Sequence, residues 1–393
     1  MDKLRLGVIG VGSVVREIYS NLYFHSEYSS MLDVAAIADP YGQALKAFGE
    51  KYGIPEDRRF PSHRDMLDAV ALDAVMVNTP DNLHHRPTVD AMNHGLDVLL
   101  PKPTADRIRD CHDMMETSRK TGRLMGVDFH KRLDPRIKEA ATLFQAGRYG
   151  PLQSAVFYML DKLLVADPNH KPRFFASPDF ASVNTPVSFL CVHMADSLLQ
   201  IIRQKPVRVR ATGFKQKLPS LKPIAVDGYD MVDTEIAFDS GALAHVITGW
   251  HLPNTAHSVT VQSGRLICRD GMVDLPMDVC GYHEIVDEGI IERNVLFQSR
   301  EADGTVSGFG MTCPGRFLRQ FLAARKGDLD ADELRESLLD PFAAGFYTTL
   351  VLQGAHESLG AGRQETEGVV AGGPIDLREL LIRELGEDAS AQY

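Results

Sequence analysis

The sequence predicts an α/β protein in which a doubly wound parallel sheet is followed by an α+β domain with a largely antiparallel, open sheet. In the first third of the chain, short apolar runs alternate with segments of helical spacing, as expected where helices connect parallel strands. Beyond about residue 150, alternating runs are joined by short turns such as Asp239-Ser240-Gly241, as expected for antiparallel strands. We place the domain boundary near residue 130, giving domains 1–130 and 131–393.

The elements of the first domain follow from apolar periodicity. Strands are expected at 4–9, 34–38, near Phe60, 74–78, 98–100 and 124–129. Helices are expected between them at 14–22, 43–52, 64–70, 86–93 and 107–121. In the second domain, strands are expected within 207–214, 233–250 and 257–269, and helices at 315–324, 342–359 and 377–384.

Composition excludes several classes of partner. The 393 residues carry 42 Lys and Arg against 53 Asp and Glu, a net charge of -11, with no basic block to follow a nucleic-acid backbone. The five cysteines are scattered without a Cys-x-x-Cys pair, which argues against a disulfide framework or a zinc site and fits a reducing cytoplasm. No apolar stretch is long enough to span a membrane, and glycines interrupt the N-terminal apolar run, so no export signal is expected. We therefore expect a cytoplasmic protein without metal, nucleic-acid or membrane partners.

A glycine turn follows the first expected strand, in the stretch GVIGVGSVV. Gly10 permits a tight turn, and Gly12 lets the backbone approach a pyrophosphate at the start of the next helix. Asp39 ends the second strand, where its carboxylate can accept hydrogen bonds from ribose hydroxyls. This context indicates a Rossmann-type domain that binds NAD. NADP is disfavoured because the negative charge of Asp39 would repel a 2'-phosphate and no arginine follows Asp39 to bind that group. The alternative is a purely structural turn, with Asp39 capping the next helix.

Lys102 lies between two prolines in the stretch VLLPKPTADR. Proline cannot donate to a sheet and restricts the residue before it, so Pro101 and Pro103 end a strand and begin a fixed turn. The lysine is therefore expected to be held in place. The alternative is a solvated lysine at a strand end.

These motifs together resemble the Gfo/Idh/MocA family of NAD(P)-dependent oxidoreductases. The matching segments are TPDNLH at 79–84, PKP at 101–103, DFHKRLDP at 128–135 and VHMAD at 192–196, and they occur in the family's order. The resemblance implies that Lys102 lies beside the nicotinamide, that the Lys-Pro bond is often cis, and that a cation there polarises the reacting hydroxyl.

The expected site residues follow from these motifs. For the cofactor they are Gly10, Gly12, Ser13, Val14, Asp39, Thr79, Pro80, Asn82, His84 and Lys102. For the substrate they are Lys102, Asp128, His130, Arg132, His193 and Asp196. Lys102 and His193 are the expected catalytic residues.

His193 is the expected base, because hydride transfer from an alcohol also requires a proton acceptor and imidazole titrates near neutrality. Asp196 follows three residues later on the same face of the helix. The alternative is that His193 is a structural residue of the core whose hydrogen-bonding partner is Asp196. The chain departs from the family at Phe189 and Pro101, where carboxylates are usual. The nearby polar residues that could replace the missing orienting carboxylate are Asp128, Ser188 and Asn184.

Three functions remain open from the sequence. The first is an NAD-dependent dehydrogenase acting on a secondary hydroxyl of a sugar, glycoside or cyclitol. The second is a glycoside-cleaving enzyme that oxidises its substrate transiently and then returns the hydride, and the third is a cofactor-binding regulator without turnover. The open face of the second sheet predicts a homodimer or homotetramer.

Overall fold

The computed structural model describes residues 3–175, 177, 179–287 and 289–393. The chain forms two compact units: Met1–Leu133 with Leu296–Phe346, and Asp134–Val295 with Tyr347–Tyr393. The expected division placed everything beyond residue 130 in one domain. The structure instead groups residues 296–346 with the N-terminal unit.

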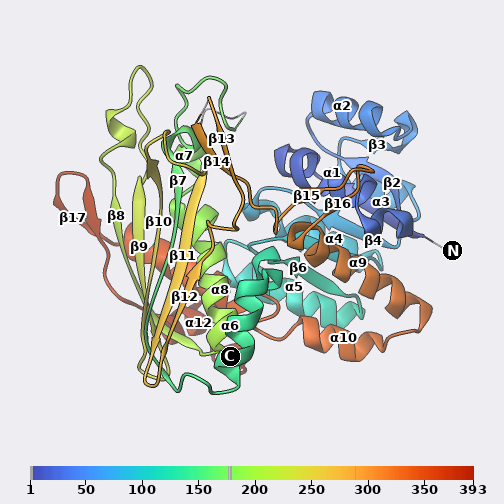
Figure 1. The fold of residues 1–393 in the computed structure, drawn as a ribbon. Coiled ribbons are helices and arrows are strands. Elements are labelled where there is room, and N and C mark those ends of the chain that lie inside the picture. The colour runs from blue at the N-terminus through green and yellow to red at the C-terminus, as the bar shows by residue number, and fades with distance from the viewer. Residues whose placement is uncertain (1–2, 176, 178, 288) are drawn as a thin grey trace. The chain divides into compact units, whose positions relative to one another are not determined.

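The first unit contains the expected parallel sheet, with strand order β3-β2-β1-β4-β5-β6 (Figure 1). Its strands are β1 (Leu4–Ile9), β2 (Leu32–Ala38), β3 (Arg59–Phe60), β4 (Ala74–Val77), β5 (Asp97–Pro101) and β6 (Met125–Asp128). All of its neighbouring strands are parallel. The strand order reverses at β1, which lies between β2 and β4, so the predicted doubly wound fold is confirmed.

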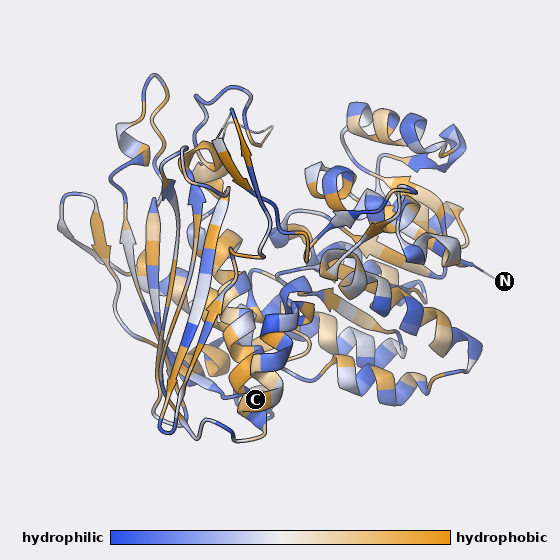
Figure 2. Ribbon diagram, in the orientation of Figure 1, coloured by the Kyte–Doolittle hydropathy of each residue, from blue (hydrophilic) through white to orange (hydrophobic). Residues whose placement is uncertain are grey.

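Helices connect these strands and contribute to the core of the first unit. They are η1 (Val15–Tyr19), α1 (Ser20–Phe24), η2 (Glu27–Met31), α2 (Gly42–Tyr52), η3 (Glu56–Arg58), α3 (His63–Ala69), η4 (Asp81–Leu83), α4 (His85–Asn93), α5 (Ile108–Thr121) and η5 (His130–Leu133). Figure 2 shows apolar strands in this sheet and helices with one apolar and one polar side. Leu4, Leu6 and Val8 of β1 are completely buried, so the central strand forms the middle of the core.

Residues 296–346, called the returning segment below, belong to the first unit although they follow residues 134–295 of the second unit in the chain. This segment contains β15 (Ser299–Arg300), β16 (Val306–Ser307), α9 (Phe309–Lys326) and α10 (Ala331–Leu338). The α9 helix packs on the sheet at a glycine: a Cβ on Gly126 of β6 would lie 2.7 Å from the Phe317 ring. A Cβ on Gly315 would likewise overlap the Tyr28 ring, so α9 also fits closely against η2. The periodicity of 315–324 correctly predicts a helix, but periodicity does not indicate which core receives that helix.

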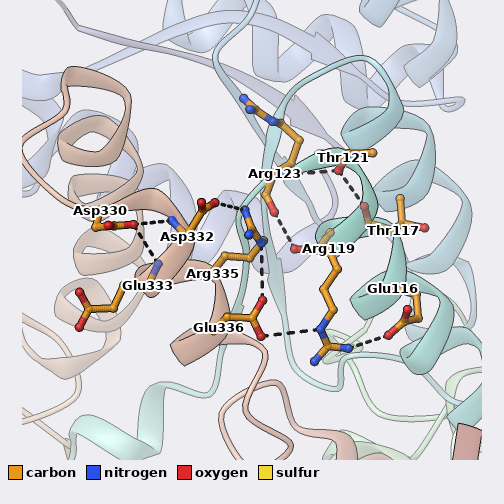
Figure 3. A network of polar contacts seen from close by, with 11 residues as sticks. Glu116, Thr117, Arg119, Thr121, Arg123, Asp330, Asp332, Glu333, Arg335 and Glu336 are labelled. Atoms are coloured by element: carbon orange, nitrogen blue, oxygen red, sulfur yellow. Dashed lines mark hydrogen bonds and ion pairs between the residues drawn. The ribbon is translucent and has the colours of Figure 1, made fainter.

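A polar network joins α10 to α5 (Figure 3). Arg335 of α10 contacts Asp332 at 2.8 Å and Glu336 at 3.8 Å. Glu336 faces Arg119 of α5 at 3.8 Å, and Arg119 donates a hydrogen bond of 2.6 Å to Glu116. Since the Glu336 side chain is 59% exposed, each surface pair contributes less than about 1 kcal/mol. The network therefore contributes little to the stability of the fold.

The second unit contains a mixed, largely antiparallel sheet with strand order β12-β11-β7-β10-β9-β8-β18-β17, and β19 also pairs with β8. Its strands are β7 (Leu152–Lys162), β8 (Pro206–Phe214), β9 (Met231–Phe238), β10 (Leu243–Leu252), β11 (Thr260–Cys268), β12 (Met272–Pro276), β17 (Arg363–Thr366), β18 (Val369–Ala371) and β19 (Ile375–Asp376). The predicted antiparallel character is confirmed, with one exception: β7 and β10 are parallel neighbours. The strand β7 is not among those expected from the sequence, although its residues alternate between more buried and more exposed positions.

Helices and a separate hairpin complete the second unit. They are α6 (Pro135–Gln145), η6 (Leu163–Val165), α7 (Phe180–Val183), η7 (Val187–Cys191), α8 (Val192–Ile202), η8 (Leu218–Ser220), α11 (Phe346–Gly360), α12 (Leu377–Leu385), α13 (Glu387–Ser390) and the hairpin strands β13 (His283–Val286) and β14 (Gly289–Glu292). The side chains of Ala244, Val246 and Trp250 on β10 are completely buried, so one face of the sheet forms the core. In the part of the chain that the structure describes, no helix combines the length and apolarity needed to cross a bilayer.

Candidate functional site

The carboxyl ends of the parallel strands carry the predicted cofactor residues. Parallel strands end at the same edge of a sheet, so the segments after β1, β2, β4, β5 and β6 gather there (Figure 1). The reversal of strand order at β1 opens a ligand crevice at this edge in doubly wound sheets.

The glycine turn after β1 is shaped by its neighbours. Gly10 has φ +86°, and a Cβ there would lie 2.6 Å from the main-chain oxygen of Asn78. Gly12 is exposed, and a Cβ there would meet no atom within 4 Å. The following helical residues leave this surface accessible, since Ser13 is partly exposed and Val14 is 47% exposed. The turn therefore closes tightly at Gly10 and leaves its backbone open at Gly12, which fits a bound pyrophosphate.

Asp39, just after β2, holds the glycine turn in place. Its Oδ2 accepts a hydrogen bond of 2.8 Å from the backbone N–H of Val11. Its Oδ1 accepts one of 2.8 Å from the N–H of Tyr41, immediately before α2. A carboxylate oxygen accepts more than one hydrogen bond, so these contacts are compatible with a further bond to a ribose hydroxyl.

The end of β4 presents buried oxygen atoms without partners. Among the described residues, neither Asn78 Oδ1 nor Thr79 Oγ1 has a hydrogen-bond partner, although both atoms are buried. Buried polar atoms are usually hydrogen-bonded, so this edge is suited to a polar ligand. Pro80 and Asn82 are exposed beside it.

The ring of His84 contacts backbone groups of the protein itself. It is completely buried, its Nδ1 lies 2.9 Å from the Pro103 oxygen, and its Nε2 lies 3.0 Å from the Thr79 oxygen. Both ring nitrogens therefore contact backbone carbonyls. This arrangement leaves neither nitrogen for the nucleotide contact expected from the sequence.

Lys102 lies just beyond β5 on the predicted turn. The Lys102–Pro103 bond is cis, as the family resemblance suggested. Lys102 is partly exposed, whereas Pro103, Thr104 and Ala105 are buried. The hydroxyl of Thr104 donates to the carbonyl oxygen of Ala344. The lysine is thus the accessible residue of an anchored turn.

Asp128 ends β6 directly beside this turn, where it is the register partner of Pro101. It is 1% exposed, and its Oδ2 accepts a hydrogen bond of 2.9 Å from the Tyr19 hydroxyl. Its Oδ1 is buried without a hydrogen-bond partner within the described ranges. Burial raises the pKa of Asp128 to about 6, against the opposing effects of Cys313, Tyr19 and the positive charges of Arg132 and Lys102.

His130 and Arg132 follow on η5. The His130 ring packs against Phe297 and Phe309, and burial lowers its pKa to about 3, with Lys131 and Lys102 acting in the same direction. His130 is therefore neutral near physiological pH.

Arg132 supports the returning segment. It donates hydrogen bonds of 2.7 Å to the carbonyl oxygens of Ala343 and Phe342, and its guanidinium lies 4.1 Å from the centroid of the Phe129 ring. These contacts give Arg132 a structural function in addition to any substrate contact.

Several residues around this edge were not identified from the sequence. They are Tyr19, Cys313, Phe342, Ala344 and Gly345. The sequence expected a helix over 342–359, whereas α11 begins at Phe346. Gly345 has φ +72°, which ends the preceding turn. A glycine so close to the helix start is the one local signal for this boundary.

The second unit carries His193 on α8. His193 is partly exposed, and Asp196, on the same helix, is 2% exposed and accepts a hydrogen bond of 3.1 Å from Thr348 Oγ1. Phe189 lies in η7, where its ring packs edge-on against Phe175 and Phe180. An aromatic cluster thus occupies the place where the family has a carboxylate.

The alternative polar residues near Phe189 make local contacts. Ser188 Oγ donates to the Thr185 oxygen at 3.2 Å, and Asn184 Nδ2 donates to the Phe180 oxygen at 2.9 Å. Within the residues that the structure describes, no group of three or more His, Cys, Asp or Glu side chains is arranged to hold a metal ion.

Comparison with known proteins supports this description. D-Glucoside 3-dehydrogenase of Escherichia coli strain K12 is 32% identical over 129 residues, which are 33% of this chain and 35% of that protein. The rhizopine catabolism protein MocA of Rhizobium meliloti is 26% identical over 219 residues, 55% of this chain and 62% of that protein. The matched segment is thus about a third of the Escherichia coli protein and less than two thirds of the MocA protein.

A solved structure has the same fold. The scyllo-inositol dehydrogenase from Lactobacillus casei, with bound NAD(H) and scyllo-inositol, superposes with a TM-score of 0.69 at 16% identity, covering 94% of this chain and 99% of that one. The model of the oxidoreductase family with an NAD-binding Rossmann fold matches residues 4–129. These residues include the glycine turn, the Lys102 turn and Asp128 described above. The N-terminal domain, residues 4–129, therefore matches the Gfo/Idh/MocA family of oxidoreductases.

Proposed function

We propose that this protein is an NAD-dependent dehydrogenase acting on a secondary hydroxyl of a sugar, glycoside or cyclitol. The observation that carries the proposal is the position of Lys102. This lysine lies on an anchored turn beside the buried Asp128, at the carboxyl edge of the parallel sheet. The names of the relatives, a glucoside dehydrogenase and an inositol dehydrogenase, support this class of substrate.

The residues at the edge of the sheet fit NAD. The open backbone at Gly12 would face the pyrophosphate, Asp39 the ribose hydroxyls, and the unpartnered oxygens of Asn78 and Thr79 other polar groups of the nucleotide. NAD is preferred over NADP because the Asp39 carboxylate would repel a 2'-phosphate. The other predicted cofactor residues, Ser13, Val14, Pro80 and Asn82, all retain exposed surface.

Oxidation of an alcohol removes a hydride from carbon and a proton from oxygen. NAD, when bound, supplies the hydride acceptor. In our proposal, Lys102 donates a hydrogen bond to the reacting oxygen and offsets its developing negative charge. The imidazole of His193 accepts the hydroxyl proton. Asp196, fixed by Thr348, would orient that imidazole, which Phe189 cannot do.

Other predicted substrate residues have supporting roles. Asp128 and His130 would contact substrate hydroxyls, because Asp128 lies beside the Lys102 turn and His130 follows it on η5. Burial lowers the pKa of His130 and keeps the ring uncharged near physiological pH. Arg132 would act mainly by fixing the segment that anchors the Lys102 turn.

We further propose that the second unit binds substrate and mediates self-association. Leu243 and Ile267 are 39% and 40% exposed, and both are register partners of Ser154 of β7, so they lie in one row on one face of the sheet. An exposed apolar row of this kind suits an interface between copies of the chain in a homodimer or homotetramer. A cytoplasmic location is proposed because, within the described residues, no disulfide joins the five cysteines.

One experiment separates the possible functions. The purified protein is incubated with NAD or NADP and a panel of sugars, glycosides and cyclitols, and both reduced nicotinamide and carbohydrate products are followed. Accumulation of NADH together with a keto product supports the dehydrogenase. A cleaved glycoside without net NADH indicates transient oxidation, and cofactor binding without any product indicates a regulator.

A further inference from the structure

His84 bridges two backbone segments at the edge of the parallel sheet. Its Nε2 contacts the carbonyl of Thr79, just after β4, and its Nδ1 contacts the carbonyl of Pro103, just after Lys102. The two distances are 3.0 and 2.9 Å, and the residue has no exposed surface. A rigid ring therefore spans from the turn that follows β4 to the turn that carries Lys102.

The chemistry of these contacts is restrictive. Carbonyl oxygens only accept hydrogen bonds, so a ring nitrogen that carries hydrogen donates to the carbonyl that it contacts. Asp81, three residues earlier on η4, interacts electrostatically with both His84 and Lys102.

A second anchor acts on the other side of the turn. The Thr104 hydroxyl donates to the Ala344 carbonyl, and Thr104 is completely buried. Lys102 thus precedes two consecutive residues whose polar groups are fixed: the Pro103 carbonyl by His84 and the Thr104 side chain by the returning segment. Among residues 102–105, Lys102 is partly exposed and the other three are buried.

We propose that His84 is a positioning residue for catalysis: by binding the Pro103 and Thr79 carbonyls together, it fixes Lys102 relative to the nucleotide-binding end of β4. This inference rests on the proposed function, because it assigns to His84 the placement of the lysine that polarises the substrate. It differs from the expected role of His84 as a cofactor contact. Small displacements of a catalytic group reduce turnover strongly, so the loss of His84 should lower kcat by about tenfold or more.

The test compares His84→Ala and His84→Gln with His85→Gln. His85 is the adjacent, partly exposed histidine, and it pairs with Asp113 instead of the turns. We expect His84→Ala to lower kcat while leaving the Kd of NAD nearly unchanged, and His84→Gln to recover part of the loss through its single amide donor group. His85→Gln should behave like the unmodified protein.

A double-mutant cycle with Lys102→Ala shows whether His84 affects kcat through Lys102. If His84 acts through Lys102, then His84→Ala costs little further kcat once the lysine has been removed. Equal losses in the presence and absence of Lys102, or an unchanged kcat in His84→Ala, overturn the positioning role. If Lys102→Ala itself retains full activity, the proposed function of the lysine fails instead.

A measurement without substrate supplies a second criterion. Hydrogen exchange of the peptide containing residues 101–106 should be faster in His84→Ala and His84→Gln than in His85→Gln at equal global stability. Unchanged exchange in both His84 variants would overturn the inference, because it would show that the ring does not restrain the Lys102 turn.

Discussion

The Tyr19 hydroxyl donates a hydrogen bond of 2.9 Å to Oδ2 of Asp128, which links the helix after the glycine turn to the end of β6. Burial raises the pKa of Tyr19 well above its ordinary value, so the phenol remains a donor at all physiological pH values. One oxygen of Asp128 is thereby fixed, and the other is buried without a hydrogen-bond partner in the described part of the chain.

The first prediction concerns the pH dependence of stability. Asp128 binds its proton up to about pH 6 in the folded protein, against an ordinary pKa of 3.8. Between these values the folded state holds more protons than the unfolded state, so the free energy of unfolding falls as pH rises. The contribution of Asp128 amounts to about 3 kcal/mol at most. Urea unfolding of Asp128→Asn between about pH 4 and pH 6 should lack this part of the decline.

Asp33→Asn provides the control, because Asp33 is an exposed residue on β2. It should retain the pH dependence of the unmodified protein. If Asp128→Asn shows the same slope as Asp33→Asn, then burial does not hold the proton on Asp128.

The second prediction concerns the cofactor. If Asp39 binds the ribose hydroxyls, calorimetry should show tighter binding of NAD than of NADP, and Asp39→Ala should reduce the difference. The same variant should also weaken NAD binding in general, because Asp39 holds the Val11 and Tyr41 amides of the turn. Equal affinity for both nucleotides in the unmodified protein would refute the assignment.

The third prediction concerns the catalytic residues. Lys102→Ala and His193→Ala should each lower kcat by roughly a hundredfold or more, with the Kd of NAD almost unchanged, since both groups act mainly in the transition state. The rate should also fall as pH is lowered, because a protonated imidazole accepts no proton. Steady-state kinetics over a pH series measures both effects.

Lys46→Ala is the matched control, because Lys46 lies on α2 with its side chain 72% exposed. It should leave kcat unchanged. An unaltered rate and pH profile in His193→Ala would place the base elsewhere and refute the role taken from the family.

The fourth prediction concerns the returning segment. Gly345 has φ +72°, and a Cβ there would lie 2.5 Å from Phe129 Cζ and 2.8 Å from Thr104 Oγ1. Gly345→Ala should destabilise the protein by about 2 kcal/mol or more, because strain and steric overlap add. Gly53 has a similar φ of +70° but open space around its Cβ position. Gly53→Ala should therefore cost only about 1 kcal/mol in thermal unfolding.

A smaller loss for Gly345→Ala than for Gly53→Ala would contradict the close packing at Gly345. It would also weaken the argument that the returning segment anchors the Lys102 turn.

The fifth prediction concerns self-association. Light scattering at micromolar concentration should detect an oligomer, and Leu243→Lys combined with Ile267→Lys should dissociate it, because both side chains lie in one exposed row of the sheet. Leu329→Lys, at a residue that is 43% exposed on the first unit, is the control. A strictly monomeric unmodified protein would refute the interface but not the fold.

Much of the fold could be read from local patterns. The strand Leu4–Ile9 begins and ends where the apolar run does, and β11 lies within its expected segment. The elements β8, β9, β10 and α12 extend one or two residues beyond the segments expected for them. These elements were predictable because each one contains a largely apolar run or a periodic pattern of apolar residues. The pattern of β7 is equally regular, and Gly150-Pro151 stands directly before it, but β7 is not among the expected strands.

The site was predictable only in part. The position of Lys102 followed from its two prolines, because proline limits local backbone geometry regardless of what packs around it. The contacts of His84 did not follow, because a histidine in a motif does not show which carbonyls its ring will meet. The same holds for Arg132, whose partners Phe342 and Ala343 are more than two hundred residues away, at separations of 210 and 211.

The sequence by itself thus determined the doubly wound sheet, the glycine turn and the fixed lysine, since these depend on periodicity and on the backbone limits of glycine and proline. The tertiary structure decided which core receives residues 296–346, and it placed Tyr19 on Asp128, His84 on the Lys102 turn and Thr104 on Ala344. These contacts join residues far apart in the chain, or depend on which side chain is buried, and burial is set by packing of the complete unit.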